Sequence, residues 1–215
     1  MAGQTSANST NPRKRPNREA EVIDAAIEVF YQRGYAAATI QDVADRVGVL
    51  KGSLYYYIDS KEDLLHRIFT ESYEQSVVLL AEAGALDAPP LDRLRSYFRA
   101  YVLWYLKNVE RVSLYFNDWK ALTGKRRAEV IEQRAVYETF IREHIDEAKH
   151  DGTVSEEIDT KYAVFFLLGA VNGVPTWYRR RGPDSPEHIA ESYADMVIAT
   201  LLGMPSRGRS DEANA

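Results

Sequence analysis

The stretch TIQDVADRVGVLKGSLYYYIDSKEDLL, residues 39–65, decides the fold, because two short helical patterns flank one glycine. Thr39 is a favourable N-cap for the first helix, and Asp42 complements that helix's positive end. The apolar positions that follow share one helical face: Ile40, Val43, Ala44 and Val47. Gly48 permits a tight turn after this face. The spacing therefore predicts a helix, a glycine turn and a second helix that ends near Ile58.

The second short helix carries three consecutive tyrosines on a surface that most helices fill with Glu and Lys. At 100° per residue, Leu54 and Ile58 share the face that can dock on the preceding helices. The remaining positions point outward or to the flank: Lys51, Gly52, Ser53, Tyr55, Tyr56 and Tyr57. A tyrosine ring can pack on a thymine methyl, and its hydroxyl can bond a phosphate. The pattern predicts a helix-turn-helix that reads double-stranded DNA in the major groove.

The rest of the chain has helical periodicity and no strand alternation, so we expect an all-α protein of about nine helices. Glycines or prolines separate the segments, as at Gly34, Gly84 and the Pro89–Pro90 pair, and Ser185 precedes Pro186 as an N-cap. We predict an N-terminal DNA-binding domain followed by a larger helical domain. The predicted boundaries are a disordered basic arm over 1–17, a helix-turn-helix domain over 18–64, a larger domain over 65–204 with helix 60–84 bridging the two, and a frayed tail over 205–215.

Composition narrows the class of protein. The 215 residues include no cysteine, which excludes disulfides and thiolate chemistry and suits a reducing cytoplasm. No signal peptide is evident, and the longest apolar run, 163–171, is too short to span a bilayer. Net charge is −5, yet the cluster RKRPNR at 13–18 is basic. This cluster suits either an arm that grips phosphates or a solvated tail.

The segment 39–65 resembles the DNA-binding signature of the TetR family of transcriptional regulators. The matching positions are Thr39, Ala44, Gly48, Val49, Gly52, Leu54, Tyr55, Lys61, Glu62 and Leu64. Three positions depart from the usual pattern: Leu50 replaces a capping serine, Tyr57 a histidine and Ile58 a phenylalanine. These changes put the operator sequence in doubt rather than DNA binding itself.

The resemblance implies roles for individual residues in DNA binding. Gln41 is expected to read a base from the first helix of the motif, since glutamine pairs with adenine. Base edges or methyl groups would be met by Lys51, Ser53 and Tyr56, with Gly52 allowing close approach. Phosphates would be held by Thr39, Tyr55, Tyr57 and Lys61.

The resemblance also implies a ligand-binding domain beyond about residue 85, where aromatic residues crowd the sequence. Such residues form either a packed core or the wall of an apolar cavity. We expect Pro175 to kink its helix and free a carbonyl near Val171, with Asn172 as a polar handle. The candidate ligand residues are Tyr101, Trp104, Tyr105, Trp119, Tyr137, Phe166, Asn172, Trp177 and Arg179.

Family architecture further implies a homodimer through the last two long helices. Gly169 and Gly173 would let another helix approach closely, and a stripe follows on the last helix at Ile189, Tyr193, Met196, Val197 and Leu201. Burial of this stripe within one subunit is the alternative. A symmetric dimer would place two recognition helices about 34–36 Å apart on a pseudo-palindromic operator.

The segments around 51–65 and 177–191 are also similar to those of regulators that sense acyl-CoA or steroid-CoA thioesters. In that interpretation the arginines at 179–181 form a cationic rim for a coenzyme A phosphate; otherwise they interact with a helix C-terminus and solvent. The usual family behaviour is repression relieved by a small-molecule effector, and no cofactor is expected.

Three other functions were weighed. An enzyme is disfavoured because the four histidines have no metal-ligand spacing, and neither a phosphate loop nor a nucleophile elbow occurs. An interaction module that has lost DNA binding is disfavoured by the intact positions from Thr39 to Lys61. A regulator whose C-terminal domain is packed and controlled by a protein partner stays an alternative.

Overall fold

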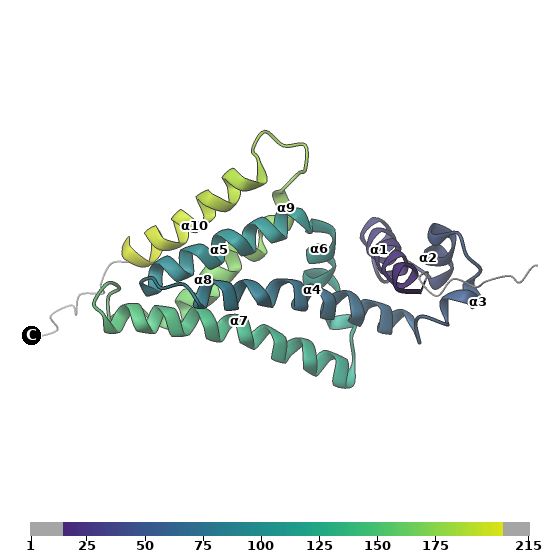
Figure 1. Ribbon diagram of the computed structural model, residues 1–215, viewed down its shortest axis with the longest axis horizontal. Coiled ribbons are helices and arrows are strands. Elements are labelled where there is room, and N and C mark those ends of the chain that lie inside the picture. Colours follow the sequence, from purple (N-terminus) through teal and green to yellow (C-terminus); the bar gives the residue numbers. More distant parts are fainter. Residues whose placement is uncertain (1–14, 204–215) are drawn as a thin grey trace, which may run out of the picture. The chain divides into compact units, whose positions relative to one another are not determined.

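The computed structural model describes residues 15–203, with side chains from Arg18 onward, and every regular element in this range is helical (Figure 1). The expected all-α class is confirmed. The predicted basic arm and C-terminal tail fall largely at 1–14 and 204–215, outside the described residues. The first helix begins at Arg15, so the last three positions of the predicted arm are helical.

The chain divides into two compact units, one ending at Ile68 and the other beginning at Phe69. The first unit contains α1 (Arg15–Arg33), α2 (Ile40–Val47), α3 (Lys51–Leu54) and the first turns of α4 (Lys61–Gly84). The second contains the rest of α4, then α5 (Pro90–Lys107), α6 (Val109–Asp118), the 3-10 turn η2 (Trp119–Ala121), α7 (Gly124–His150), α8 (Thr160–Asn172), α9 (Val174–Trp177) and α10 (Pro186–Gly203). Helix α4 thus belongs to both units.

Local capping signals define the helices of the first unit. The Thr39 hydroxyl accepts a hydrogen bond from the Asp42 backbone N–H at 3.1 Å, and the Asp42 carboxylate accepts one from the Thr39 N–H at 2.8 Å. This reciprocal capping box starts α2 as predicted. Gly48 ends α2 with φ +76°, a left-handed conformation that glycine adopts without strain. Ser60 caps α4 by accepting from the Asp63 N–H at 3.0 Å.

Helix α3 is shorter than the sequence predicts. Its regular part ends at Leu54, and a turn follows over 55–57. Leu50, at the N-cap, makes no side-chain capping bond, which fits its departure from the family's serine. After Leu54 the backbone tightens, because Tyr57 donates to the Leu54 carbonyl three residues earlier at 2.8 Å.

The apolar faces of α1, α2 and α3 meet in one small core. Its buried members include Val22, Ile23, Ala26, Phe30, Ile40, Val43, Ala44, Leu54, Ile58, Leu64 and Leu65. Leu54 and Ile58 therefore face inward as the sequence predicts. Their burial leaves the tyrosines of this segment at or near the surface.

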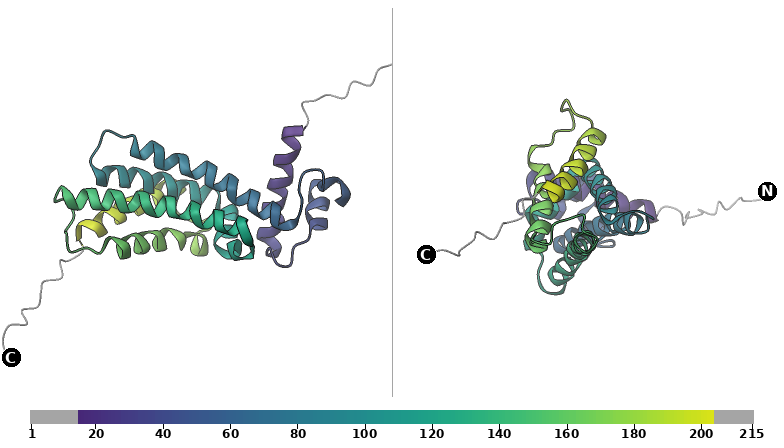
Figure 2. Two further views of the ribbon diagram at one scale, coloured as in Figure 1. Left: turned by 90° about the horizontal axis from the view of Figure 1, so that it is seen from below. Right: turned by 90° about the vertical axis from the view of Figure 1, so that its left-hand side faces the viewer.

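The second unit is a bundle in which α4, α5, α7 and α8 run roughly along one another (Figure 2). Helix α5 is central, because it contacts α6, α7, α9 and α10. The chain is interrupted between α8 and α9 at Gly173, two residues before Pro175. A break at this proline is what the sequence predicts, since proline lacks the N–H that a continuous helix requires.

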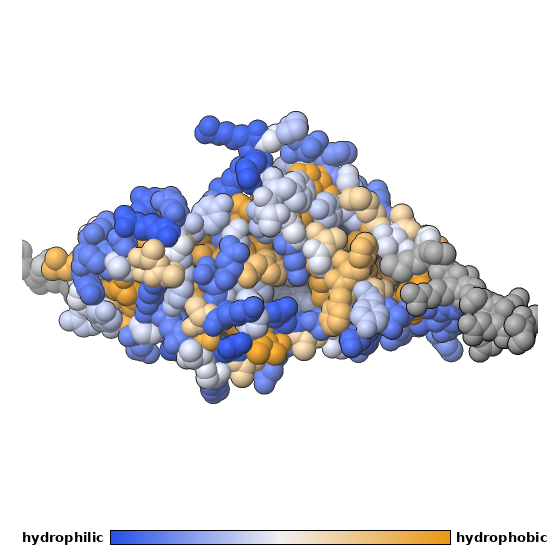
Figure 3. All heavy atoms as spheres, turned by 180° about the vertical axis from the view of Figure 1, so that it is seen from behind, coloured by the Kyte–Doolittle hydropathy of each residue, from blue (hydrophilic) through white to orange (hydrophobic). Residues whose placement is uncertain are grey.

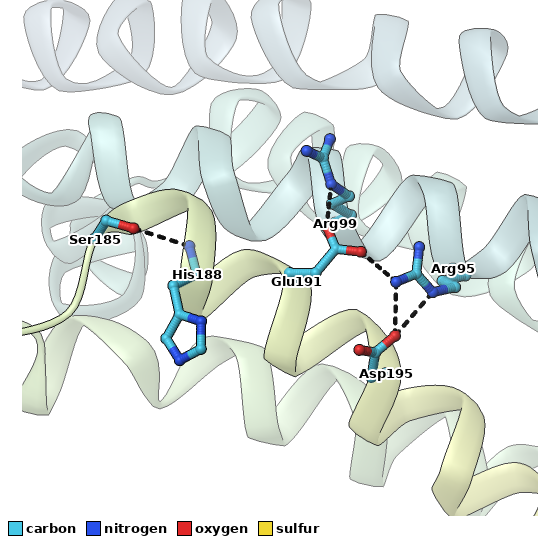
Figure 4. Close-up of polar contacts among 6 residues, drawn as sticks. All are labelled: Arg95, Arg99, Ser185, His188, Glu191 and Asp195. Carbon is cyan, nitrogen blue, oxygen red and sulfur yellow. Dashed lines mark hydrogen bonds and ion pairs between the residues drawn. The ribbon is translucent and has the colours of Figure 1, made fainter.

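Charged side chains fasten α10 to α5 (Figure 4). The Arg95 guanidinium donates to Glu191 and, at 2.7 Å, to Asp195, while Arg99 donates to the other oxygen of Glu191. Ser185 caps α10 by accepting from the His188 N–H at 3.2 Å. Beneath the ion pairs the two helices share an apolar contact.

The stripe predicted to form a subunit interface on α10 is divided. Ile189, Val197 and Leu201 are buried inside this chain's own core, whereas Met196 is exposed. The alternative of burial within one subunit therefore holds for these three residues. Within residues 15–203, no helix is both long and apolar enough to cross a membrane.

Candidate nucleic-acid interface and ligand pocket

The exposed face of the helix-turn-helix is built by α3 and the turn after it. Tyr56 is 88% exposed and Tyr55 is 50% exposed, while Leu54, at the end of α3, is fully buried. Lys51 and Gly52 are exposed, and Ser53 and Tyr57 are partly buried. Nothing lies within 4 Å of the position that a Cβ on Gly52 would take. This face therefore offers rings, hydroxyls, an ammonium group and a bare backbone to a partner.

The other predicted DNA contacts already have partners inside the first unit. The Gln41 amide donates to Asp45 on the same helix at 2.7 Å. The Thr39 hydroxyl is used in the α2 cap. Lys61 donates to the Ala36 carbonyl at 3.3 Å and lies 4.3 Å from the centre of the Tyr35 ring. Contact with a phosphate or base would compete with these bonds for Gln41, and would add to them for Lys61.

A pocket opens in the second unit, with an empty volume of about 650 Å³ that includes space open to solvent. Five helices contribute to its wall, and eight of the 17 lining side chains are aromatic. The lining residues include Ser76, Tyr101, Trp104, Tyr105, Arg111, Tyr115, Phe116, Arg134, Tyr137, Leu168 and Asn172. Large aromatic rings with a few polar groups are typical of small-molecule sites.

Five of the nine predicted ligand residues line this pocket: Tyr101, Trp104, Tyr105, Tyr137 and Asn172. The other four lie elsewhere in the unit. Trp119 packs under the Arg127 and Arg134 guanidinium groups, Trp177 stacks on Tyr193, and Phe166 is 59% exposed on α8. Arg179 donates to the Tyr178 carbonyl at 2.9 Å.

Hydroxyl groups form short chains along the pocket wall. The Tyr101 and Tyr105 oxygens are 2.9 Å apart, and Tyr105 donates to Asn172 at 3.5 Å. The Tyr137 oxygen lies 2.6 Å from Ser76, whose hydroxyl also donates to a backbone carbonyl on α4. Burial raises the pKa of Tyr101 and Tyr105 well above the usual value, so both stay neutral donors at physiological pH.

Sequence reasoning missed the charged part of the pocket. Arg111 on α6 is buried, and its Nη1 lies 3.0 Å from Glu71 on α4. Arg134 on α7 also lines the pocket. The helical spacing of Arg111, on the same side of α6 as Tyr115, is the signal that could have placed it here. No group of side chains with the composition of a metal site occurs among residues whose side chains are described.

Comparison with known proteins gives two family matches. Residues 22–68 match the model described as bacterial regulatory proteins, tetR family. Residues 87–201, more than half of the chain, match the tetracyclin repressor-like C-terminal domain. Together the matches cover the helix-turn-helix and most of the second unit.

Individual relatives agree with these matches. The chain is 27% identical over 192 residues to the HTH-type transcriptional repressor KstR2 of Rhodococcus jostii, covering 87% of this chain and 92% of that protein. The structure of the ketosteroid transcriptional regulator KstR2 of Mycobacterium tuberculosis has a TM-score of 0.81 at 22% identity, over 91% of this chain and 96% of that one. The structure of AibR in complex with isovaleryl coenzyme A and operator DNA has a TM-score of 0.75 at 24% identity, over 86% and 98%.

The two structural matches establish the fold, and the family models establish the membership. Helix-turn-helix, capping box and exposed tyrosine face all occur in the segment that the N-terminal model covers. The chain is therefore a member of the TetR family, a DNA-binding transcriptional regulator and not an enzyme.

Proposed function

We propose that this regulator is a cytoplasmic homodimeric repressor that leaves a pseudo-palindromic operator when a small apolar or acyl-CoA-type effector enters its pocket. The proposal rests on the separation of buried from exposed residues in α3 and the turn after it. Leu54 and Ile58 are buried while Lys51, Tyr55 and Tyr56 are exposed, so the segment is held rigidly with a contact face turned outward. A rigid element that presents polar and aromatic groups is what base and phosphate recognition needs.

In this proposal each exposed residue has a role on the duplex. Lys51, Ser53 and Tyr56 meet base edges or methyl groups, Gly52 admits the DNA backbone, and Gln41 reads a base once its bond to Asp45 is exchanged. Phosphates are held by Tyr55, Tyr57, Lys61 and the N-terminal turn of α2 at Thr39.

The effector class rests on the pocket's chemistry and on the relatives. Tyr101, Trp104, Tyr105 and Tyr137 supply apolar surface and neutral hydroxyl donors, and Asn172 supplies an amide. One relative is called a ketosteroid regulator and another was solved with isovaleryl coenzyme A. Both names support an apolar acyl or ring-bearing effector. Trp119, Phe166, Trp177 and Arg179, outside this pocket, would contact only a part of the effector that extends beyond it.

The dimer is proposed on an exposed apolar surface of α8 and α10. In Figure 3, hydrophobic residues (orange) gather between polar ones on the second unit. The exposed apolar residues on the two helices are Tyr162, Phe165, Phe166, Met196 and Leu202. Gly169 on α8 is also exposed, with nothing within 4 Å of its Cβ position, so a partner helix could approach there. A second copy would remove this surface from water.

Control by a protein partner on a packed C-terminal domain is the less favoured alternative, because aromatic and polar side chains from five helices line a pocket in this domain. In the proposed mechanism, α4 carries the signal. It contributes Ser76 to the pocket and Lys61 to the DNA-binding unit within one 24-residue helix. An effector must bind the two states of this helix unequally to shift their populations.

Fluorescence anisotropy tests the proposal with duplex DNA from upstream of the regulator's own gene, across a salt series and with long-chain and steroid acyl-CoAs. Tyr55→Ala and Tyr57→Ala should each weaken binding while leaving the unfolding temperature nearly unchanged. Tyr31→Ala is the matched control, because Tyr31 is 48% exposed on α1 and has no assigned DNA role.

Tight, salt-dependent binding that one thioester abolishes would support the whole proposal. Binding that no thioester affects would remove the acyl-CoA effector and leave the DNA-binding part. Equal affinities for wild type, Tyr55→Ala and Tyr57→Ala would remove these tyrosines from the interface.

A further inference from the structure

A buried guanidinium borders the ligand pocket. The Arg111 side chain is 10% exposed, and its Nη1 lies 3.0 Å from Oε2 of Glu71. Arg111 lines the pocket whereas Glu71 does not. Glu71 is 40% exposed, so its carboxylate can move into water at little cost. Arg111 therefore both pairs with Glu71 and borders the pocket.

A buried guanidinium beside an aromatic pocket lowers the stability of the fold unless an anionic group binds it. Removing a guanidinium from water is costly, and an apolar pair of similar volume is often as stable as an ion pair. The Arg93–Glu147 pair, which links α5 to α7, serves as a comparison. It lies outside the pocket, and Arg93 keeps 21% of its side chain exposed. A pair that only joined two helices would not need a guanidinium in the wall of an aromatic pocket.

A second cation, Arg134 on α7, also lines the pocket. Tyr115 lies one helical turn after Arg111 on α6. Burial raises the pKa of Tyr115 to about 12, the nearby Arg134 guanidinium opposes this rise, and Glu138 adds to it. Arg111, Tyr115 and Arg134 are all hydrogen-bond donors that line the pocket, and among the described lining residues Glu138 supplies the one carboxylate.

We infer that the pocket takes an amphiphilic anion, with an apolar body against the aromatic wall and an oxyanion against Arg111. This inference rests on the proposed function of the pocket as an effector site. The ligand's oxyanion accepts the hydrogen bonds of the guanidinium, supported by Tyr115 and Arg134. Glu71 leaves to solvent, so one carboxylate–guanidinium pair is exchanged for another. Charge-assisted bonds of this kind are about twice as strong as neutral ones.

Two dyes of matched shape test the inference: 1-anilinonaphthalene-8-sulfonate, which is anionic, and N-phenyl-1-naphthylamine, which is the same skeleton without charge. Fluorescence titration of the full chain should show that Arg111→Gln weakens the anionic dye by about tenfold or more, as loss of a charge-assisted bond predicts. The neutral dye should change by less than about twofold, because it carries no anionic group for the guanidinium to bind. Glu71→Gln should strengthen the anionic dye, because it removes the competing carboxylate.

Arg93→Gln is the matched control, since it breaks an inter-helix arginine–glutamate pair outside the pocket and should leave both dyes unaffected. If Arg111→Gln does not fold, Arg111→Lys keeps the charge but loses the planar fork, and should weaken the anionic dye selectively. Equal weakening of both dyes by Arg111→Gln, or weakening of the anionic dye by Glu71→Gln, would overturn the inference.

The dye titrations distinguish failure of the proposed pocket from failure of the oxyanion site alone. Wild-type protein that binds neither dye would overturn the proposed pocket itself. Wild-type protein that binds the neutral dye, but not the anionic one, would overturn only the oxyanion site. Competition against the neutral dye then identifies the oxyanion: dependence of dodecanoate on Arg111 supports a free carboxylate, and dependence of dodecanoyl-CoA alone supports a coenzyme A phosphate.

Discussion

The Arg95 guanidinium on α5 and the Asp195 carboxylate on α10 are joined by two hydrogen bonds, at 2.7 and 2.9 Å. The same arginine also holds Glu191, one turn earlier on α10, so a single side chain spans a full turn of the neighbouring helix. Because these groups are largely exposed, each bond contributes modestly and depends on salt. The two helices also contribute buried apolar residues to the same core.

This network should make part of the thermal stability dependent on pH. Hydrogen bonds from Arg95 and Arg99 lower the pKa of Glu191 from its usual 4.5. A carboxyl with a lowered pKa stabilises the fold above its unfolded-state pKa, and this stabilisation is lost as pH falls through the lowered value. Glu191→Gln should lower Tm by about 1–3 °C at pH 7 and by less at pH 3. Differential scanning calorimetry checks this, with exposed Glu156→Gln as control. A difference that persists undiminished at pH 3 would contradict the assignment.

Substitution by alanine should have different effects at two glycines of the helix-turn-helix: loss of stability at one and loss of DNA affinity at the other. Gly48 has φ +76°, so Gly48→Ala should destabilise the protein by roughly 1–2 kcal/mol in urea unfolding. Gly52 has no such φ and has free space at its Cβ position, so Gly52→Ala should change stability by less than about 0.5 kcal/mol. Its DNA affinity should nevertheless fall on the order of tenfold if DNA approaches the bare backbone. Unchanged DNA affinity in Gly52→Ala would place the duplex farther away.

Filling the pocket should block it without affecting DNA binding. Leu168 lines the pocket from α8, so Leu168→Trp should weaken N-phenyl-1-naphthylamine by about tenfold or more through loss of space. Val78→Trp is the control, because Val78 on α4 is exposed and does not line the pocket. Dye fluorescence and DNA anisotropy are measured on both variants. Equal dye binding by both would show that the dye binds elsewhere.

A charge on the exposed face of α8 should separate a dimer. Phe166→Glu should convert the protein to a monomer in analytical ultracentrifugation, since an unpaired carboxylate is costly inside an apolar interface. Val78→Glu is the control, because Val78 on α4 is exposed to a similar degree but has no assigned partner. A dimer that survives Phe166→Glu, with Val78→Glu separating it instead, would move the interface to α4.

Local signals made the helix-turn-helix predictable from the sequence. The capping box at Thr39 and Asp42, the left-handed Gly48 and the Ser185 cap all depend on residues within a few positions of one another. The regular length of α3 was overestimated, because the tightening after Leu54 depends on how the following turn packs. Leu54 and Ile58 still face the core as their spacing predicts.

The pocket was only partly predictable, because membership depends on contacts between helices distant in sequence. Aromatic content indicated Tyr101 and Trp104 as readily as Phe166 and Trp177, and periodicity does not say which neighbour a face meets. The α10 stripe shows the same limit, since Val197 and Leu201 pack within their own chain. Arg111 was missed because a lone arginine in a helix usually indicates a solvated position.

The two functional sites also differ in how they are distributed along the chain. The candidate DNA contacts lie between Thr39 and Lys61, whereas the pocket wall is assembled from five helices between Phe69 and Asn172. A change of operator therefore needs substitutions only within one short contiguous segment. A change of effector needs coordinated substitutions in several helices. Recombination can exchange the DNA-binding segment as one piece, whereas the pocket must change through separate substitutions.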